Sequence, residues 1–301
     1  MSGFGFTETV AYSFDPEASC DRLRLKEDDP RRSMIHILNP LTEDQAVMRT
    51  SLVPGILETM HFNMARQIKN LRVFEIGKIF LKSDQQVLPR EPEMLIALWT
   101  GARTDASWYS RETLCDFYDI KGAVEALMRA LKVASVRFTA MADESCEYTR
   151  PGHTAQIVAS DVQVGLVGEI HPRVGENYDL KQAAFIFELD LEKLAGLIPQ
   201  ASKSKPIPRF PAIYRDITII VDRKIETRAV LETVENFQEE LIESLHLFDV
   251  FEGDPIAAGK KSVSFRVTYR SPGKTLEDED VTDLHKSITE RLLKAFDATL
   301  P

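Results

Sequence analysis

Residues 262–270 carry side chains suited to binding chemistry. Polar residues alternate strictly with apolar ones here, so the segment predicts a strand with one apolar and one polar face. The polar row comprises Ser264, Arg266, Thr268 and Arg270. Hydroxyls both donate and accept hydrogen bonds, and guanidiniums pair with phosphate. A row of this kind is what an open sheet face would show, and RNA-recognition domains stack bases on such sheets.

Generic catalytic motifs are absent from the sequence. There is no GxxxxGK phosphate loop, no HExxH and no GxSxG. His36, His61 and His285 stand alone, and the three cysteines include no C-x-x-C pair. The acidic run at 278–280 fits the first turn of a helix, where carboxylates complement the helix dipole. We therefore predict no catalytic residue and no metal site.

The composition indicates a folded protein of about two domains. The chain has 301 residues, of which 44% are hydrophobic, enough for real cores. It lacks an apolar run of membrane-spanning length and a signal peptide, so we expect a cytoplasmic protein without membrane contact. The formal charge of −10 argues against indiscriminate binding to DNA or RNA, which depends on cations that neutralise phosphates. Any RNA contact must therefore be local.

A polar, proline-punctuated segment at 198–208 predicts a boundary between domains at 1–200 and 207–301. The second domain has the pattern β-α-β-β-α, with few residues left for a last strand. Its strands are expected at 217–221, 245–251 and 262–270, and its helices at 227–241 and from a cap at Thr275 onward. This order predicts a ferredoxin-like βαββαβ domain, in which both helices cover one face of the sheet.

The first domain reads as α+β, with helices flanking a mixed, largely antiparallel sheet. Strands are expected at 7–14, 73–81, 94–101, 157–170 and 184–190, and helices at 52–67, 120–131 and 191–197. The helix at 52–67, with Ser51 as its cap, has more apolar side chains than a one-sided helix requires. They suit either a partner surface or an internal core.

Ordered strings over nearly the whole chain resemble the β subunit of bacterial phenylalanyl-tRNA synthetases. In the first domain they are NPLTE (39–43), VMRTSLVPG (47–55), FEIGKIF (74–80), DFYDIKG (116–122) and GEIHP (168–172). In the second they are FP (210–211), RD (215–216), LFDVFEG (247–253), GKKS (259–262), YR (269–270) and KTL (274–276). The resemblance implies a class II synthetase-like core followed by a ferredoxin-fold anticodon-binding domain. Because the family subunit is longer, we expect this chain to be a fragment without proofreading activity.

The resemblance also implies that the class II core is degenerate. Active cores of the class have an arginine that binds ATP at the position where this chain has Leu81. They also have a glycine-rich segment that ends in arginine, where this chain has Glu188, Asp190 and Lys193. Carboxylates in place of glycines add bulk and negative charge, and lysine lacks the planar fork of arginine. We expect that ATP does not bind. Alternatively, Glu188 and Asp190 are simply outward-facing strand positions.

Anticodon contacts in the family, carried over by position, fall on Asp249, Phe251 and Ser262. The ring would stack on a base, and the carboxylate and hydroxyl would read its edge. Phosphates would be held by Lys260, Lys261, Arg266 and Arg270. The family usually has tyrosine in place of Phe251, and its cationic C-terminal ending is missing here. Alternatively, Phe251 closes the core and the basic residues are ordinary surface.

The expected function is that of a non-catalytic part of phenylalanine–tRNA ligase, inactive alone. It would scaffold the catalytic α subunit in an α2β2 assembly and recognise the anticodon of tRNA(Phe). The chain itself would need no cofactor, whereas ATP and magnesium would act through the α subunit. The rivals are an autonomous class II ligase paralogue and a ferredoxin-like regulatory module for a small molecule.

Overall fold

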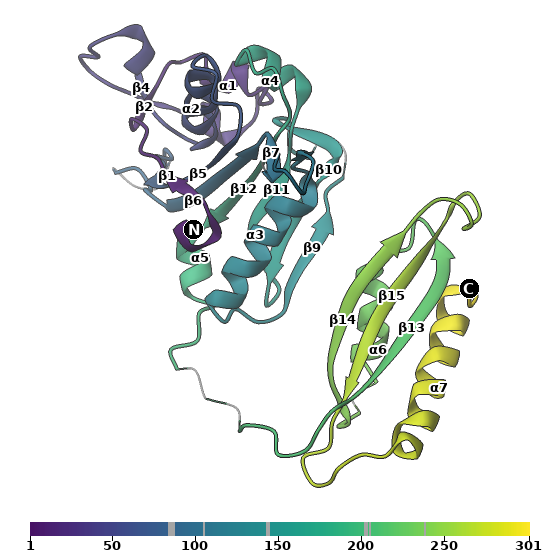
Figure 1. Cartoon of the computed structure of the whole chain (residues 1–301). Helices are drawn as coiled ribbons and strands as arrows, with labels where there is room; N and C mark the ends of the chain where they lie inside the picture. The colour runs from purple at the N-terminus through teal and green to yellow at the C-terminus, as the bar shows by residue number, and fades with distance from the viewer. Residues whose placement is uncertain (84–87, 105, 143–144, 202–203, 205, 238) are drawn as a thin grey trace. The chain divides into compact units, whose positions relative to one another are not determined.

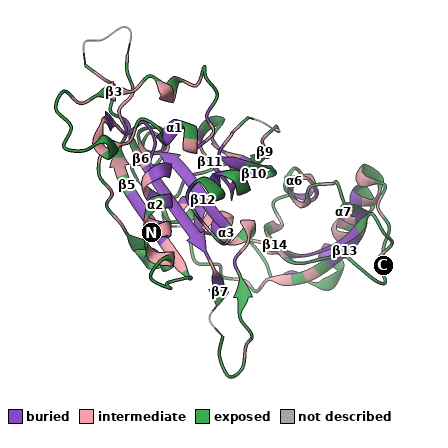
Figure 2. Cartoon of the chain, turned by 90° about the horizontal axis from the view of Figure 1, so that it is seen from above, coloured by how far each residue is buried: buried purple, intermediate pink, exposed green. Residues whose placement is uncertain are grey.

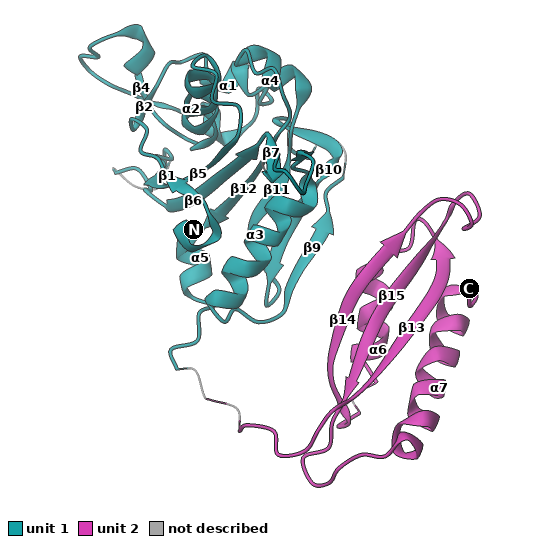
Figure 3. Cartoon of the chain, viewed as in Figure 1, with its two compact units in different colours: residues 1–202 teal, residues 203–301 magenta. Residues whose placement is uncertain are grey.

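The chain folds into two compact units, Met1–Ser202 and Lys203–Pro301 (Figures 1 and 3). The computed structural model describes the whole chain apart from residues 84–87, 105, 143–144, 202–203, 205 and 238. Among the described residues, no helix is both long and apolar enough to cross a bilayer.

Unit 1 is built on a seven-stranded mixed sheet in the order β1-β5-β6-β12-β11-β10-β9. Only β1 and β5 pair in parallel; all other neighbours are antiparallel. The strands are β1 (Thr7–Glu8), β5 (Leu71–Lys78), β6 (Glu93–Thr100), β9 (Val136–Ala140), β10 (Thr149–Ala159), β11 (Val162–Ile170) and β12 (Ala184–Asp190). The predicted α+β class, with a largely antiparallel sheet, is therefore confirmed.

Helices cover both faces of this sheet. One core lies under α3 (Phe117–Ala130) and α5 (Leu191–Ala195). The opposite core lies under α1 (Ser19–Arg22), α2 (Val53–Met64) and α4 (Pro172–Asn177). Short elements complete the unit: η1 (Ser2–Phe4), η2 (Pro30–Arg32), η3 (Glu43–Gln45), β2 (Phe14–Asp15), β3 (Ile35–His36), β4 (Val47–Met48), β7 (Ala102–Thr104) and β8 (Thr113–Leu114).

Strand β12 lies at the centre of the sheet, and all of its residues are buried (Figure 2). Strand side chains alternate between faces, so Phe185 and Phe187 enter the α3 core whereas Ala184 and Ile186 enter the α2 core. Position 188 therefore also points toward the α2 side, into the protein interior.

Several boundaries differ from the sequence-based expectations. The strand expected at 7–14 is two short strands, because β1 joins the large sheet and β2 joins a small one with β4. Helix α2 begins at Val53, whose N–H donates to Ser51 Oγ at 3.1 Å, and it ends before the left-handed Gln67. The apolar residues of α2 belong to the internal core, since Leu52, Val53, Ile56, Leu57 and Met60 are at most 1% exposed.

Unit 2 is a ferredoxin-like domain. The sheet order is β13-β15-β14, and the helices pack on one face only. The elements are β13 (Ile213–Asp222), α6 (Thr227–Glu235), β14 (Ile242–Phe251), β15 (Lys260–Tyr269) and α7 (Asp278–Phe296). The expected last strand is reduced to a bridge in which Ile220 and Thr299 exchange two hydrogen bonds of 2.8 and 3.1 Å.

The ends of the unit 2 helices also differ from the prediction. Helix α6 ends at Glu235, before the predicted end at 241. Helix α7 is capped by a reciprocal box between Glu277 and Asp280, and Thr275 does not cap it. The acidic residues 278–280 do occupy its first turn, as expected. No cluster of potential metal ligands is found in the part of the chain that the structure describes.

Candidate nucleic-acid interface

The sheet of unit 2 presents one face without a covering helix. In β15, Val263, Phe265 and Val267 are fully buried against the helices, so the even-numbered residues between them point to the opposite face. We call this the open face and define it by cross-strand pairing with these even-numbered residues. Its paired members are Tyr214, Asp216, Thr218 and Ile220 from β13, Ser262, Ser264, Arg266 and Thr268 from β15, and Ser244, His246, Asp249 and Phe251 from β14. Phe248 has no cross-strand partner in this register, and we include it because its ring centre lies 5.9 Å from the Arg266 guanidinium carbon.

A β-bulge places Asp249 and Phe251 on this face. Leu247 pairs with the buried Phe265, and regular alternation would send Asp249 and Phe251 to the helix side as well. The register instead shifts between Leu247 and Asp249, so Asp249 pairs with Ser264 and Phe251 pairs with Ser262. The inserted residue, Phe248, is 50% exposed and Phe251 is 43% exposed. The bulge thus turns a predicted stacking ring toward solvent.

The serine hydroxyls at the centre of the open face, Ser262 and Ser264, are largely buried by the side chains of neighbouring strands. Ser262 is only 8% exposed between its cross-strand neighbours Ile220 and Phe251. Ser264 shares a hydrogen bond of 2.9 Å with Thr218. Ser262 therefore lies beside the Phe251 ring but has little free surface of its own.

Arg266 is held in place by a carboxylate on the neighbouring strand. Its Nε and Nη2 donate to the two Asp216 oxygens at 2.7 and 2.8 Å, and these bonds lower the pKa of Asp216. The guanidinium carbon lies 6.0 Å from the centre of the Tyr214 ring and 5.9 Å from that of the Phe248 ring. Its charge is thus already balanced, and its planar group lies between two exposed rings.

The remaining basic residues lie in three different settings. Lys260 is exposed at the end of the open face, where it pairs in register with Asp222. Lys261 pairs with the core residue Val221, so it lies on the helix side and is only 9% exposed. Arg270 donates to both Glu243 oxygens at 3.0 Å and to the Phe210 carbonyl. Of the predicted phosphate contacts, only Lys260 is both exposed on this face and without an ion pair among the described residues.

Family comparisons agree with this architecture. Residues 208–301 match the family model described as a ferredoxin-fold anticodon binding domain, and residues 1–191 match that of the phenylalanyl tRNA synthetase beta chain CLM domain. The chain belongs to the phenylalanyl-tRNA synthetase β-chain family.

Similar proteins include three phenylalanine–tRNA ligase beta subunits. That of Geobacter sulfurreducens is 36% identical over 100% of this chain and 37% of its own length, and that of Syntrophotalea carbinolica is 38% identical over the same shares. That of Syntrophus aciditrophicus is 38% identical over 97% of this chain and 36% of its own length. The chain thus spans little more than a third of these relatives.

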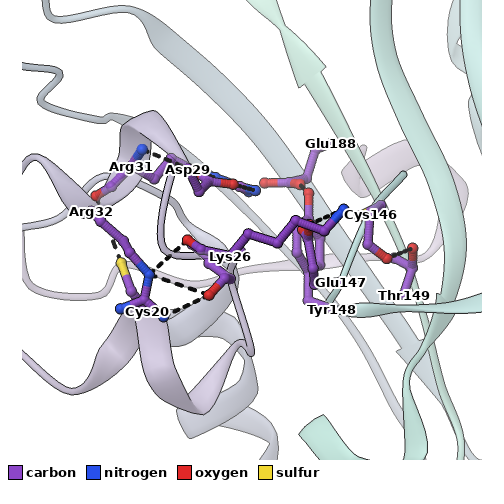
Figure 4. A network of polar contacts seen from close by, with 11 residues as sticks. Cys20, Lys26, Asp29, Arg31, Arg32, Cys146, Glu147, Tyr148, Thr149 and Glu188 are labelled. Atoms are coloured by element: carbon purple, nitrogen blue, oxygen red, sulfur yellow. Dashed lines mark hydrogen bonds and ion pairs between the residues drawn. The ribbon is translucent and has the colours of Figure 1, made fainter. Parts of the chain in front are cut away.

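In unit 1, the position expected to be a degenerate nucleotide site is filled by a buried polar network (Figure 4). Tyr148 OH donates to Glu188 Oε2 at 2.6 Å, and the Arg31 guanidinium lies 5.1 Å from the centre of the Tyr148 ring. Arg31 itself is fixed by two hydrogen bonds to Asp29, at 2.9 and 2.7 Å. The interpretation of Glu188 as an outward strand position is therefore wrong, because it is only 9% exposed and points inward.

Burial controls the ionisation of this network. It raises the pKa of Glu188, although the hydrogen bond from Tyr148 and the charge of Arg31 oppose the shift. Burial and the neighbouring Glu188 carboxyl raise the pKa of Tyr148. Burial lowers the pKa of Arg31, but the side-chain hydrogen bond to Asp29 and the charges of Tyr148, Asp29 and Glu188 together more than offset burial, so that this pKa is raised. Glu188 is thus a buried acid whose hydrogen-bond partner is another side chain of unit 1.

The other residues of the expected nucleotide site serve the fold. Asp190 is buried and caps α5, accepting from the Lys193 N–H at 3.1 Å, and the Lys193 ammonium lies 3.6 Å from its carboxylate. Leu81 forms a bridge with Arg90 and packs against the α2 core. Helix capping by an aspartate at the end of a strand is visible in a sequence, but it was missed here.

Sequence reasoning also missed the partners. Tyr148 and Arg31 are 40 and 157 positions away from Glu188, and no local pattern links them. Tyr214 and Phe248 were overlooked on the open face. Alternation alone places Tyr214 in the polar row of β13, whereas Phe248 needs the bulge.

Proposed function

We propose that the chain is the anticodon-reading and scaffolding part of a phenylalanine–tRNA ligase β subunit, without catalytic residues of its own. The observation that carries the proposal is the open face, where Phe251 and Asp249 emerge side by side in a unit that matches an anticodon-binding family. The relatives are named as beta subunits of phenylalanine–tRNA ligase, and tRNA(Phe) is therefore the proposed ligand.

The proposed reading mechanism divides the work among three residues. The Phe251 ring stacks on a base, which contributes about 1–3 kcal/mol irrespective of base identity. The Asp249 carboxylate, which has no ion pair among the described residues, accepts from a base amino or imino group and supplies selectivity. Lys260 contacts phosphate. Ser262 contributes at most an edge contact, because its hydroxyl is largely covered.

For unit 1 we propose a scaffold role toward the catalytic α subunit, within an α2β2 heterotetramer. The apolar residues Leu52, Val53, Ile56, Leu57 and Met60 cannot supply the pairing surface, because the internal core buries them. Large apolar side chains that are exposed elsewhere in the unit support a partner surface: Tyr12, Leu38, Leu41, Trp108 and Tyr109. We propose that ATP and magnesium act through the α subunit, and that the assembly is cytoplasmic.

The direct test is binding of tRNA(Phe) by the parent chain and by the Phe251→Ala variant. The variant should bind about 1–3 kcal/mol more weakly, with unchanged thermal unfolding of unit 2. An anticodon-swapped tRNA serves as the specificity control. If Phe251→Ala unfolds unit 2, or binds both RNAs as the parent does, the anticodon assignment should be abandoned.

The scaffold role has its own test. Purified catalytic α subunit should co-purify with this chain; failure to do so, when the full-length β subunit succeeds, would refute the role. Neither rival function has a supporting observation. ATP–pyrophosphate exchange by this chain alone would revive the ligase paralogue. Thermal stabilisation by an amino acid without any RNA response would favour the regulatory module.

A further inference from the structure

The open face carries a cluster of Tyr214, Phe248 and Arg266 that a single base stacked on Phe251 would not contact. Tyr214 is 58% exposed and Phe248 is 50% exposed. The two rings lie on opposite sides of the Arg266 guanidinium. Large rings left half exposed on a sheet do not complete the core of unit 2, which the helix-side residues already form. Their grouping around a planar cation calls for a ligand.

We infer that Phe248, Arg266 and Tyr214 form a second base-stacking position beside Phe251, so that the open face takes at least two consecutive unpaired bases of an RNA loop. This inference rests on the proposed function and extends it to residues outside the predicted contacts. Sheets that read single-stranded RNA stack two or three bases on exposed aromatic rings.

The geometry gives Arg266 a different role from the predicted phosphate contact. Its two hydrogen bonds to Asp216 balance its charge and fix its plane. A guanidinium held in this way stacks on rings and bases, whereas a free one would pair with phosphate. Arg266 is therefore a positioning and stacking group, and phosphate binding falls to Lys260 at the end of the face.

The bulge makes Phe248 part of the same surface as Phe251. Phe248 occupies the inserted position, directly before Asp249, and Phe251 follows three residues later. The aromatic and cationic groups favour an RNA ligand over a protein strand, because each flat group offers a face to a base. A base on Phe248 would be next to one on Phe251, with Asp249 between them.

The test compares Phe248→Leu, Tyr214→Leu and Phe251→Leu in the whole chain, using the anticodon stem-loop of tRNA(Phe). Leucine keeps apolar volume but removes the aromatic face. Phe248→Leu should weaken binding about five- to hundredfold and Tyr214→Leu by a smaller factor. Because no phosphate contact is removed, the slope of affinity against salt should stay unchanged. Arg266→Lys, which keeps the charge but not the plane, should also weaken binding.

A matched control is available in unit 1. Phe62 is 54% exposed, and the Arg66 guanidinium lies 3.3 Å from its ring centre, so Phe62→Leu removes a similar cation–aromatic pair that does not belong to unit 2. This variant should bind the RNA as the parent does. Unit 2 should unfold at the parent temperature in every variant, which excludes loss of fold as the cause.

The outcomes separate this inference from the proposed function. If Phe251→Leu weakens binding while Phe248→Leu and Tyr214→Leu do not, the second position is refuted and the anticodon role stands. If none of the three changes binding, both fall. A dimer of the chain that is lost in Phe248→Leu would also overturn the inference, because a second copy would then cover this face.

Discussion

The buried bond between Tyr148 and Glu188 allows a sharp test of how unit 1 is held together. Tyr148→Phe removes only the hydroxyl, whose 2.6 Å bond is the side-chain hydrogen bond that Glu188 accepts among the described residues. Leaving a buried acceptor unpaired costs about 1–3 kcal/mol. In a unit of this size, that loss lowers the melting temperature by roughly 2–12 °C.

The loss should depend on pH, and the sign follows from the raised pKa of Glu188. A group whose folded pKa is raised stabilises the fold at low pH, and that stability is lost as pH rises through the folded pKa. The hydrogen bond from Tyr148 opposes this shift, so removing it raises the pKa of Glu188 further. The stability gap between variant and parent should therefore widen as pH rises above the ordinary pKa of a glutamate carboxyl.

Thermal unfolding followed by calorimetry is the appropriate assay, because unit 2 provides an internal reference transition. Tyr118→Phe is the matched control, since that ring is 74% exposed and loses a solvated hydroxyl. Glu188→Gln keeps an acceptor for Tyr148 without a buried charge, so it should be at least as stable as the parent at about pH 8. An unchanged melting temperature in Tyr148→Phe, or a gap that does not vary with pH, would refute the reasoning.

Four further predictions concern single residues. Burial raises the pKa of Asp15 to about 7, so the parent should lose stability as pH rises from about 4 to 7. In thermal unfolding, Asp15→Asn should therefore melt at a higher temperature than the parent at about pH 8 but not at about pH 4. Gly77→Ala would place a methyl group 2.2 Å from the buried Arg49 Nη2. The substitution should lower the free energy of unfolding, measured in urea, by about 1–3 kcal/mol. An unchanged urea midpoint would show that Arg49 moves aside freely. Asp249→Asn should reduce the preference for cognate over anticodon-swapped tRNA, even if the affinity for cognate tRNA is kept. Lys260→Ala should weaken the binding of both RNAs alike and flatten the salt dependence of that binding. Filter binding at several salt concentrations measures both effects.

Local chemistry was sufficient to predict the elements of the open face from the sequence. The strict alternation of residues 262–270 predicts which β15 side chains share a face, because the strand period is two for every strand. The acidic first turn of α7 is equally local, since carboxylates there interact with the helix end itself. For the pair Asp249 and Phe251, spacing predicts only a shared face, and family resemblance suggested their role.

Which face that pair occupies depends on the tertiary structure. The bulge at Phe248 exists only through pairing with β15, and without it Asp249 and Phe251 would follow Leu247 toward the helices. Lys261 and Ser262 are neighbours in sequence but lie on opposite faces of the sheet. The charge of Arg266 is balanced by an ion pair with Asp216, which lies 50 positions earlier. Glu188 is likewise matched by Tyr148, 40 positions away. A sequence records which groups are present, but burial and long-range pairing determine which of them remain free to bind, because both arise only when distant segments pack together.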